Sequence, residues 1–180
     1  GENDSYICEL IRKDSIEDFI IYINKNNYSI NSEIQASIYE TNSFLIMKQI
    51  ESNESKNKKF TLINYAAFFG SIQIFKYLEK NGAKYTYNSI WFYAIHGQTP
   101  ELFNYIEEKY EKENIKDDCK NELFYDLFWE SIKCHHNDIA NYIINNYLND
   151  EFDISPKKIV QEHPGVVMIS PPPHSISFKK

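Results

Sequence analysis

The sequence predicts an all-α helical-repeat solenoid, because candidate helix starts recur at a constant interval. Four hydroxyl residues able to cap the free N–H groups of a helix lie 28 residues apart: Ser15, Ser43, Ser71 and Thr99. An amphipathic run follows each start, and another short apolar segment precedes it. Residues 1–154 contain no convincing strand. A repeat of this length, built from paired helices, indicates a solenoid, here of about five helix–turn–helix pairs.

The first two pairs are predicted as follows. Residues 6–12 precede the start at Ser15, where Asp18 three residues later makes a weak capping box. In the second pair, the apolar residues 34–39 are expected to form a helix that precedes the start at Ser43.

The last three pairs follow the same pattern. Residues 62–69 precede the run that begins at Ser71. Residues 90–96 precede Thr99, and Pro100 is the preferred first residue of a helix. In the fifth pair, residues 123–134 precede a start near His136, which is displaced by 37 residues from Thr99. The charged residues 107–114 account for the extra length, as a solvated loop or as a helix extension.

Composition narrows the class of protein. The chain has 180 residues, which is about one domain, and 42% hydrophobic residues exclude a disordered chain. The net charge of −7 disfavours nucleic acid, whose backbone requires clustered cations. Three cysteines without framework spacing indicate reduced thiols and a cytoplasmic protein. No apolar run approaches the length of a membrane span and the N-terminal residues lack signal-peptide features, so no membrane partner is expected.

Residues 155–180 differ in composition from residues 1–154. All three valines and five of the six prolines lie there, whereas none of the 14 tyrosines does. We therefore expect a repeat domain over 1–154 and a Pro-containing C-terminal tail over 155–180. The apolar run before the triple proline either docks, on the open end of the solenoid or in its concave groove, or is recognised by a partner; the alternative is a disordered extension. The residues concerned are Val166, Val167, Met168, Ile169, Pro171, Pro172 and Pro173.

Residues 61–83 resemble an ankyrin repeat. Residues 61–67 are similar to the family's T-P-L-H-x-A-A pattern, with Leu62 in place of Pro and Asn64 in place of His. Gly70 and the pair Gly82–Ala83 lie at the family's offsets. Weaker matches extend over roughly residues 6–150, and the whole resembles the divergent Asn- and Ile-rich ankyrin-like proteins expanded in protozoan parasites. Because the family period is about 33 residues, the shorter period implies a short or absent β-hairpin finger.

The resemblance implies a protein–protein interaction module or scaffold that binds another protein or peptide through the concave face of its inner helices, without catalysis or cofactor. We expect the contact residues to form an exposed stripe on this face, together with two tyrosines in an inter-repeat loop. These residues are Tyr65, Phe92 and Trp129, then Phe69, His96 and Lys133 one turn further on, and Tyr85 and Tyr87 in the loop. Alternatively, the stripe is core packing and the loop tyrosines cover the edge of the stack.

Two other functions stay open. The chain is either an N-terminal structural fragment of a longer ankyrin array, or a metal- or thiol-dependent regulatory protein that uses Cys134, His135 and His136. No metal is expected, because adjacent residues at a turn project in different directions and no CxxC or HxxxH spacing occurs. The sequence contains no nucleophile elbow, P-loop or dinucleotide turn, so we predict that the protein is not an enzyme. The basic residues 56–59 are expected to lie in a solvated loop.

Overall fold

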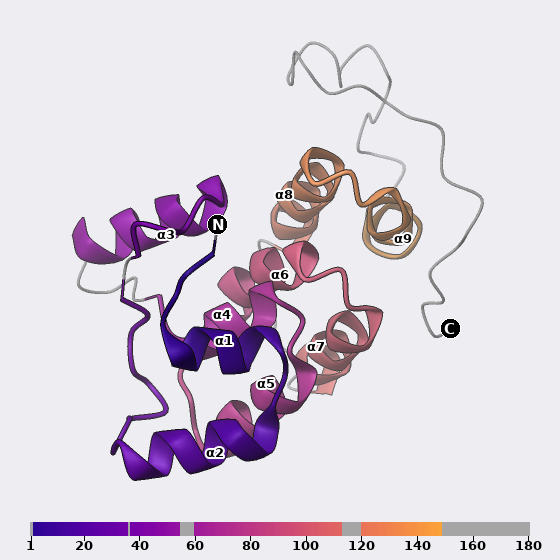
Figure 1. The fold of residues 1–180 in the computed structure, drawn as a ribbon. Helices are drawn as coiled ribbons and strands as arrows, with labels where there is room; N and C mark the ends of the chain where they lie inside the picture. Colours follow the sequence, from indigo (N-terminus) through magenta and orange to yellow (C-terminus); the bar gives the residue numbers. More distant parts are fainter. Residues whose placement is uncertain (1, 36, 55–59, 113–119, 149–180) are drawn as a thin grey trace. The chain divides into compact units, whose positions relative to one another are not determined.

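A computed structural model describes residues 2–35, 37–54, 60–112 and 120–148 (Figure 1). The regular structure of these residues is helical, apart from one isolated antiparallel bridge between Glu33 and Thr61. They fall into two compact units, one ending at Gly97 and one beginning at Gln98. None of the described helices combines the length and the apolar character that crossing a bilayer requires.

The first unit contains a stack of helices. Its elements are α1 (Tyr6–Arg12), α2 (Ile16–Lys25), α3 (Ser43–Glu54), α4 (Leu62–Phe68), α5 (Ile72–Lys80) and α6 (Tyr87–His96). The hairpins α1–α2 and α4–α5 pack on each other, α1 against α4 and α2 against α5, and α6 packs against α4 (Figure 1). We call these five helices the helix stack, with α1, α4 and α6 as its inner helices. Fully buried side chains such as Ile11, Phe19 and Phe75 form its core.

The same backbone turn precedes four of the five expected helix starts. Asp14, Gly70, Gln98 and His135 all have left-handed φ values, between 49° and 66°. Around Gly70 the turn is closed by the N–H of Ser71, which donates to the carbonyl of Ala66 at 2.9 Å, and Ser15 and His136 bond back over the same interval. This is the usual way of ending a helix with a left-handed residue. The helices α2, α5, α7 (Pro100–Lys112) and α9 (Asn137–Tyr147) therefore begin directly after the predicted starts.

The serine at the start of α5 has a different role from the one expected. Ser71 makes no side-chain bond within its own helix. Its hydroxyl donates instead to the carbonyl of Ile11 in the neighbouring hairpin, at 2.5 Å. The N-terminus of α5 is capped by the carboxylate of Asp14, which accepts from the N–H groups of Gln73 at 3.1 Å and Ile74 at 3.0 Å. The first hairpin thus supplies the cap of the next outer helix.

The prediction of a helix over residues 34–39 is wrong, since its described residues are not helical. Ile34 is held in extended conformation by its N–H, which donates to the carbonyl of Phe60 at 2.9 Å. The hydroxyl of Ser37 accepts from the N–H of Tyr39 at 3.2 Å, and the carboxylate of Glu40 accepts from the N–H of Asn42 at 2.9 Å. Such local side-chain bonds compete with a helical backbone.

Helix α3 forms at the predicted place but not in the predicted arrangement. It begins at Ser43, and the side chain of Asn42 rather than a serine accepts from the N–H of Leu45 at 3.2 Å. Instead of completing a second hairpin, α3 lies apart from α2 and α5 (Figure 1). The first and third predicted pairs therefore stack directly, since α1 contacts α4 and α2 contacts α5.

The second unit contains α7, α8 (Lys120–Lys133) and α9, of which α8 and α9 pack together. Residues 107–112 belong to α7, which agrees with the helix-extension alternative for that part of the charged stretch. The carboxylate of Glu107 accepts hydrogen bonds from the hydroxyls of Tyr142, at 2.8 Å, and Tyr147. The Tyr147 ring stacks on Phe124 with centroids 3.8 Å apart. These contacts join α7, α8 and α9 into one core.

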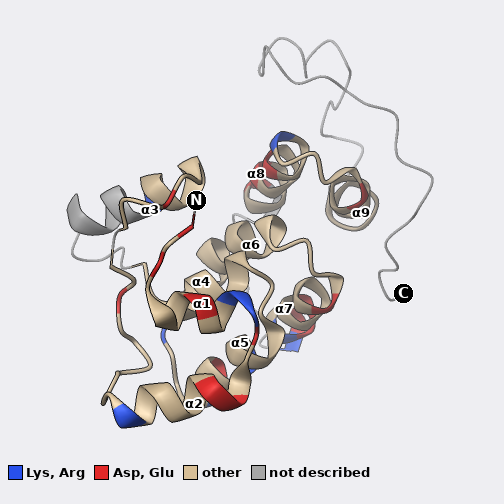
Figure 2. Cartoon of the chain, in the orientation of Figure 1, with Lys and Arg blue, Asp and Glu red and all other residues tan. Residues whose placement is uncertain are grey.

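Helix dipoles are matched by charge in both units. The first turn of α2 carries Glu17 and Asp18, and its last turn carries Lys25 (Figure 2). In α7 the first turn is acidic and the last turn basic as well. Charges placed in this way stabilise a helix by about 0.3–1 kcal/mol each at an exposed site.

Candidate partner-binding surface

Three rings at the C-terminal ends of α4 and α6 form what we call the aromatic seat: Phe68, Tyr93 and His96. The His96 ring stacks on Phe68 with centroids 5.1 Å apart and an interplanar angle of 23°. Phe44 of α3 fills the seat, and its ring centroid lies 4.1 Å from that of His96, 5.5 Å from Tyr93 and 5.9 Å from Phe68. The seat therefore already holds a phenylalanine that belongs to a helix outside the stack.

The repeat itself builds the seat. Phe68 and His96 each lie two residues before the left-handed turn residue, Gly70 or Gln98, that follows their helix. Because α4 and α6 pack side by side, equal positions on the two helices bring these rings together. Tyr93 lies one turn earlier on α6, and its ring centroid is 5.7 Å from that of Phe60. The register of neighbouring repeats thus places three rings around one site.

Close backbone contact at Gly97 fixes the two sides of the seat relative to each other. A Cβ atom at Gly97 would lie 2.7 Å from the carbonyl oxygen of Ala67 and 2.9 Å from the backbone nitrogen of Gly70. Real Cβ contacts are not this short, so only glycine fits here without a backbone shift. The end of α6 therefore lies directly against the turn that follows α4.

The prediction that Tyr65 is exposed is wrong. Its side chain is 0% exposed, and its hydroxyl accepts a hydrogen bond from Nη1 of Arg12 at 2.8 Å. The same Nη1 donates to the carbonyl of Asn3 at 2.7 Å. Burial raises the pKa of the Tyr65 phenol well above its usual range, more than the Arg12 guanidinium lowers it. Tyr65 belongs to the packing between α1 and α4, as the core alternative for the stripe anticipates.

The predicted stripe is also one residue out of register. Counted back from the turn residues, Tyr65 corresponds to Tyr93 and Glu130, whereas Phe92 and Trp129 correspond to Asn64. Phe92 is half-buried, and Trp129 is only 5% exposed. The stripe therefore does not form a continuous exposed surface, because two of its three aromatic members are buried.

The residues predicted one turn further on are distributed differently. Phe69 is half-buried and packs on Tyr65 and Phe68, with ring centroids 4.7 and 5.0 Å apart. His96 is a wall of the seat. Lys133 is exposed and forms an ion pair with Glu130 at 3.5 Å. Within the first unit the structure thus brings together Tyr65, Phe69 and His96, with Phe68 between them.

Of the two tyrosines predicted in a loop, Tyr85 lies in the segment before α6, whereas Tyr87 is the first residue of α6, so its placement in a loop is wrong. The Tyr85 hydroxyl donates to Oε1 of Glu79 at 2.6 Å, and its ring lies 6.0 Å from Phe75 and 5.6 Å from Tyr87. Burial, together with the Glu79 carboxylate, raises the pKa of Tyr85 far above its usual range. This arrangement agrees with the alternative that these tyrosines cover the edge of the stack. Their contact with a partner stays a prediction.

Cys134, His135 and His136 do not converge as a metal site. His135 is the exposed left-handed turn residue, and Nδ1 of His136 lies 3.1 Å from Nε2 of Gln98. These three side chains do not bring three ligand atoms within 4.8 Å of one another. Burial, and then the Glu130 carboxylate, raises the pKa of the Cys134 thiol to about 12, which disfavours a reactive thiolate at neutral pH. The predicted tail residues (155–180) and the basic residues 56–59 lie outside the described residues.

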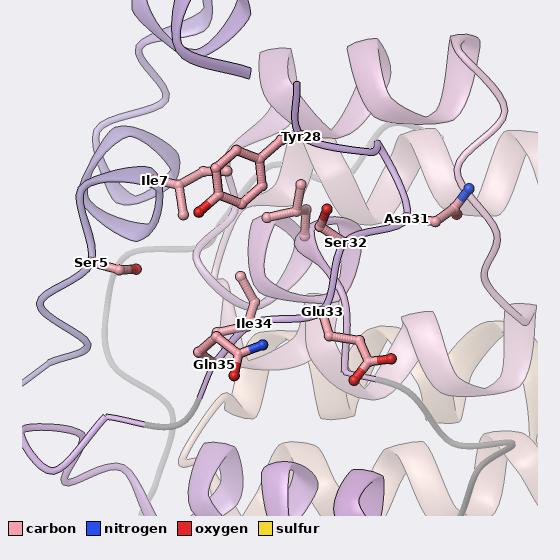
Figure 3. Close-up of a pocket in the computed structure, with 9 residues that line it drawn as sticks. Ser5, Ile7, Tyr28, Asn31, Ser32, Glu33, Ile34 and Gln35 are labelled. Carbon is pink, nitrogen blue, oxygen red and sulfur yellow. The ribbon is translucent and has the colours of Figure 1, made fainter. Parts of the chain in front are cut away.

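A second surface lies at the start of α1 and the loop after α2. A hollow of about 500 Å³ is lined by Ser5, Ile7, Leu62 and the loop residues Tyr28 and 31–35 (Figure 3). Two of its backbone and amide groups already bond within the protein: Oδ1 of Asn31 accepts from the N–H of Lys84, and the carbonyl of Gln35 accepts from Nδ2 of Asn3, both at 2.8 Å. The hollow is open and its lining is mainly loop, so it defines a site less sharply than the seat does.

Phe44 is the functional candidate that sequence reasoning missed. Its contacts with Phe68 and His96 join residues far apart in the chain, which periodicity alone does not show. A weak signal exists in the sequence: residues 44–47 are four consecutive apolar residues, which is more than one helix face can bury. In the structure, Ile46 and Met47 are 36% and 58% exposed. A helix that exposes its apolar residues is not an ordinary outer helix of a stack.

The chemistry that the seat offers is that of an apolar anchor site. Its rings attract a further ring by dispersion and quadrupole interactions, which contribute about 0.5–1.5 kcal/mol per aromatic pair beyond the burial of area. The polar groups that the seat residues supply are the imidazole of His96 and the phenol hydroxyl of Tyr93. Comparisons of the chain with protein-family models, curated proteins and solved structures gave no match.

Proposed function

We propose that the protein is an ankyrin-like helical solenoid that acts in the cytoplasm as a protein–protein interaction module, without catalysis or cofactor. Three features support the architecture. The left-handed turn recurs before four helix starts, the hairpins α1–α2 and α4–α5 pack layer on layer, and α6 continues the inner layer. Repetition of one supersecondary unit whose neighbours bury its apolar face is typical of solenoids.

One observation carries the functional part of the proposal: the seat holds the aromatic side chain of a helix that belongs to neither layer of the stack. Phe44 contacts all three rings of the seat, and Leu45 beside it is 0% exposed. The inner helices therefore form a surface to which a helix docks through one aromatic anchor. Anchors of this kind contribute most of the binding energy at protein interfaces.

Position-specific crosslinking tests this proposal. The photoreactive residue benzoylphenylalanine would replace Phe92, which lies on the inner helix α6, and in a second protein Lys80, which is exposed on the outer helix α5. Both proteins would be irradiated in lysate of the source cell. A partner bound to the inner face should give an adduct from position 92 and none from position 80.

Two controls make the result decisive. Circular dichroism establishes that both proteins are folded, and unlabelled wild-type protein in excess should suppress the adduct at position 92. Identical adducts at both positions, or no adduct at either, would contradict binding through the inner helices.

A further inference from the structure

Helix α3 is the helix of the first unit that does not belong to the helix stack. Its start obeys the 28-residue spacing, yet the stack closes without it, because the hydroxyl of Ser71 and the carboxylate of Asp14 join the first hairpin directly to α5. The cap of α3 is local, since it is supplied by Asn42 from the preceding turn. Helix α3 therefore has its own start signal, whereas the bonds that join the two hairpins come from Ser71 and Asp14.

The aromatic seat holds α3 near the start of the helix. Of the described side chains of α3, Leu45 is buried and Phe44 and Lys48 are half-buried, whereas Ile46 is 36% exposed and Met47 58%. On the approach to α3, Ile38 is 91% exposed and Tyr39 55%. The ammonium group of Lys48, on the same helix, lies 5.5 Å from the Phe44 ring centroid. We expect a helix docked in this way to detach without disturbing the packing of α1, α2, α4 and α5.

We propose that α3 is an intramolecular ligand of the aromatic seat, and that the partner displaces it by presenting a helix with a phenylalanine followed by an aliphatic residue. This inference rests on the proposed function. It specifies the chemistry of the partner and identifies α3 as the segment that regulates partner binding. The occupant is defined by what the seat already accepts: one ring between Phe68, Tyr93 and His96, and one apolar neighbour, as Phe44 and Leu45 provide. Partner binding and α3 docking exclude each other at the same three rings.

The expected strength of this control follows from population arithmetic. The apparent dissociation constant equals the intrinsic constant divided by the fraction of molecules whose seat is open. A segment tethered to its site competes at an effective concentration of about millimolar. If α3 closes at least nine seats in ten, then removing its anchor raises the affinity for an added helix about tenfold or more, which corresponds to about 1.4 kcal/mol.

The experiment uses a fluorescein-labelled peptide of residues 41–54 and the full chain. Fluorescence anisotropy would measure peptide binding to the wild type and to the Phe44→Ala variant, with circular dichroism as the check on folding. The variant should bind about tenfold more tightly than the wild type. A peptide carrying the same Phe44→Ala change should not bind either protein, and His96→Ala added to the variant should abolish the gain. Met47→Ala, at an exposed position of α3, should leave the affinity at the wild-type value.

A second variant guards against a folding defect. Asn42→Ala weakens the cap of α3 and leaves the seat intact, so it should raise peptide affinity about threefold if Phe44→Ala does not fold. Equal binding of the peptide to the wild type, Phe44→Ala and Asn42→Ala would overturn the inference. So would an absence of binding to both variants when they are folded.

The other possible occupants give distinct results, each of which would overturn the assignment to α3. A rise in affinity caused by Val167→Asp but not by Phe44→Ala would mean that the tail fills the seat. Dimerisation of Phe44→Ala in sedimentation experiments would mean that a second copy does. The proposed function is judged separately by the crosslink from position 92. An adduct of equal yield with and without Phe44 would overturn only the proposal that α3 controls binding. Loss of the adduct in both proteins would overturn the proposed interaction module itself.

Discussion

The stacked hairpins and the segment that contains α3 share the same periodic sequence signal, but only the hairpins become part of the helix stack. In the hairpins α1–α2 and α4–α5, a left-handed residue, Asp14 or Gly70, precedes the second helix, and each hairpin contributes a group to its neighbour. In the α3 segment, Asn42 stands at the corresponding place but caps α3 itself. A helix start is thus a local property, whereas membership of the stack requires an inner helix with a turn that fits its neighbours.

The largest expected difference concerns one phenylalanine from each region. Phe19 on α2 is 0% exposed and packs edge-on against Tyr77 of α5, so Phe19→Ala should cost about 4 kcal/mol of unfolding free energy through the cavity it leaves. Phe44→Ala should cost about 1 kcal/mol, because only the docking of α3 is weakened. Urea unfolding followed by circular dichroism measures both. Equal losses would show that α3 is as much a part of the core as the hairpins are.

The next effect tests how closely the repeats approach. Gly97→Ala should cost about 3 kcal/mol, because its Cβ would lie 2.7 Å from the Ala67 carbonyl oxygen. Gly82→Ala is the matched control: it has φ of 86° and no atom within 4 Å of the new Cβ, so it should cost only about 1–2 kcal/mol from the left-handed backbone. The midpoints of urea unfolding of the two variants measure this difference in stability. A Gly97→Ala variant no less stable than Gly82→Ala would contradict the close contact between α6 and the turn after α4.

A smaller effect separates a cap shared between hairpins from a local one. Asp14→Ala removes both acceptors for the N-terminus of α5 and should lower the unfolding free energy by about 1.5 kcal/mol. Asn42→Ala removes the cap of α3 alone and should change the global value by less than about 0.5 kcal/mol. Hydrogen exchange would locate the second change in α3. Comparable global losses would mean that α3 unfolds together with the stack.

The smallest effect is the dependence of stability on alkaline pH. Burial raises the pKa of Tyr65 above that of a tyrosine in the unfolded chain, which is about 10. The stabilisation is therefore fully present below about pH 10 and is lost as the pH rises beyond it, because the unfolded chain releases the proton more readily. Urea midpoints at pH 8 and pH 10.5 measure the loss. Tyr65→Phe should show a shallower decline than the wild type, and an identical decline would contradict the burial of this phenol.

The parts of the fold that could be predicted from sequence are those decided within one turn of helix. Ser15, Ser71, Thr99 and His136 mark the starts of α2, α5, α7 and α9 because each directly follows a left-handed turn residue that ends the preceding segment locally. Residues 61–83 contain the hairpin α4–α5, in which Thr61 and Asn64 form a reciprocal capping box.

What could not be predicted depends on contacts between distant residues. Periodicity places residues 34–39 in a helix, but Ser37 and Glu40 bond to the nearby backbone and Ile34 pairs with Phe60. The aromatic residues of the inner helices pointed to His96 and Phe69 on one face. The predicted register was wrong by one residue, so Tyr93 and Phe68 were left out. The seat itself exists only when α4 and α6 pack together, and no local sequence pattern shows that packing.

The direct stacking of the first hairpin on α5 has a consequence for the order of folding. The contacts of Ser71 with Ile11 and of Ile74 with Asp14 each join residues 60 positions apart, about twice the interval that the repeat would need. Closing a loop twice as long costs only about 0.6 kcal/mol more, but contacts between distant residues slow folding. We therefore expect α4 and α5 to form the nucleus and the first hairpin to dock late. Refolding rates of Asp14→Ala should then equal those of the wild type, with the whole loss of stability in faster unfolding.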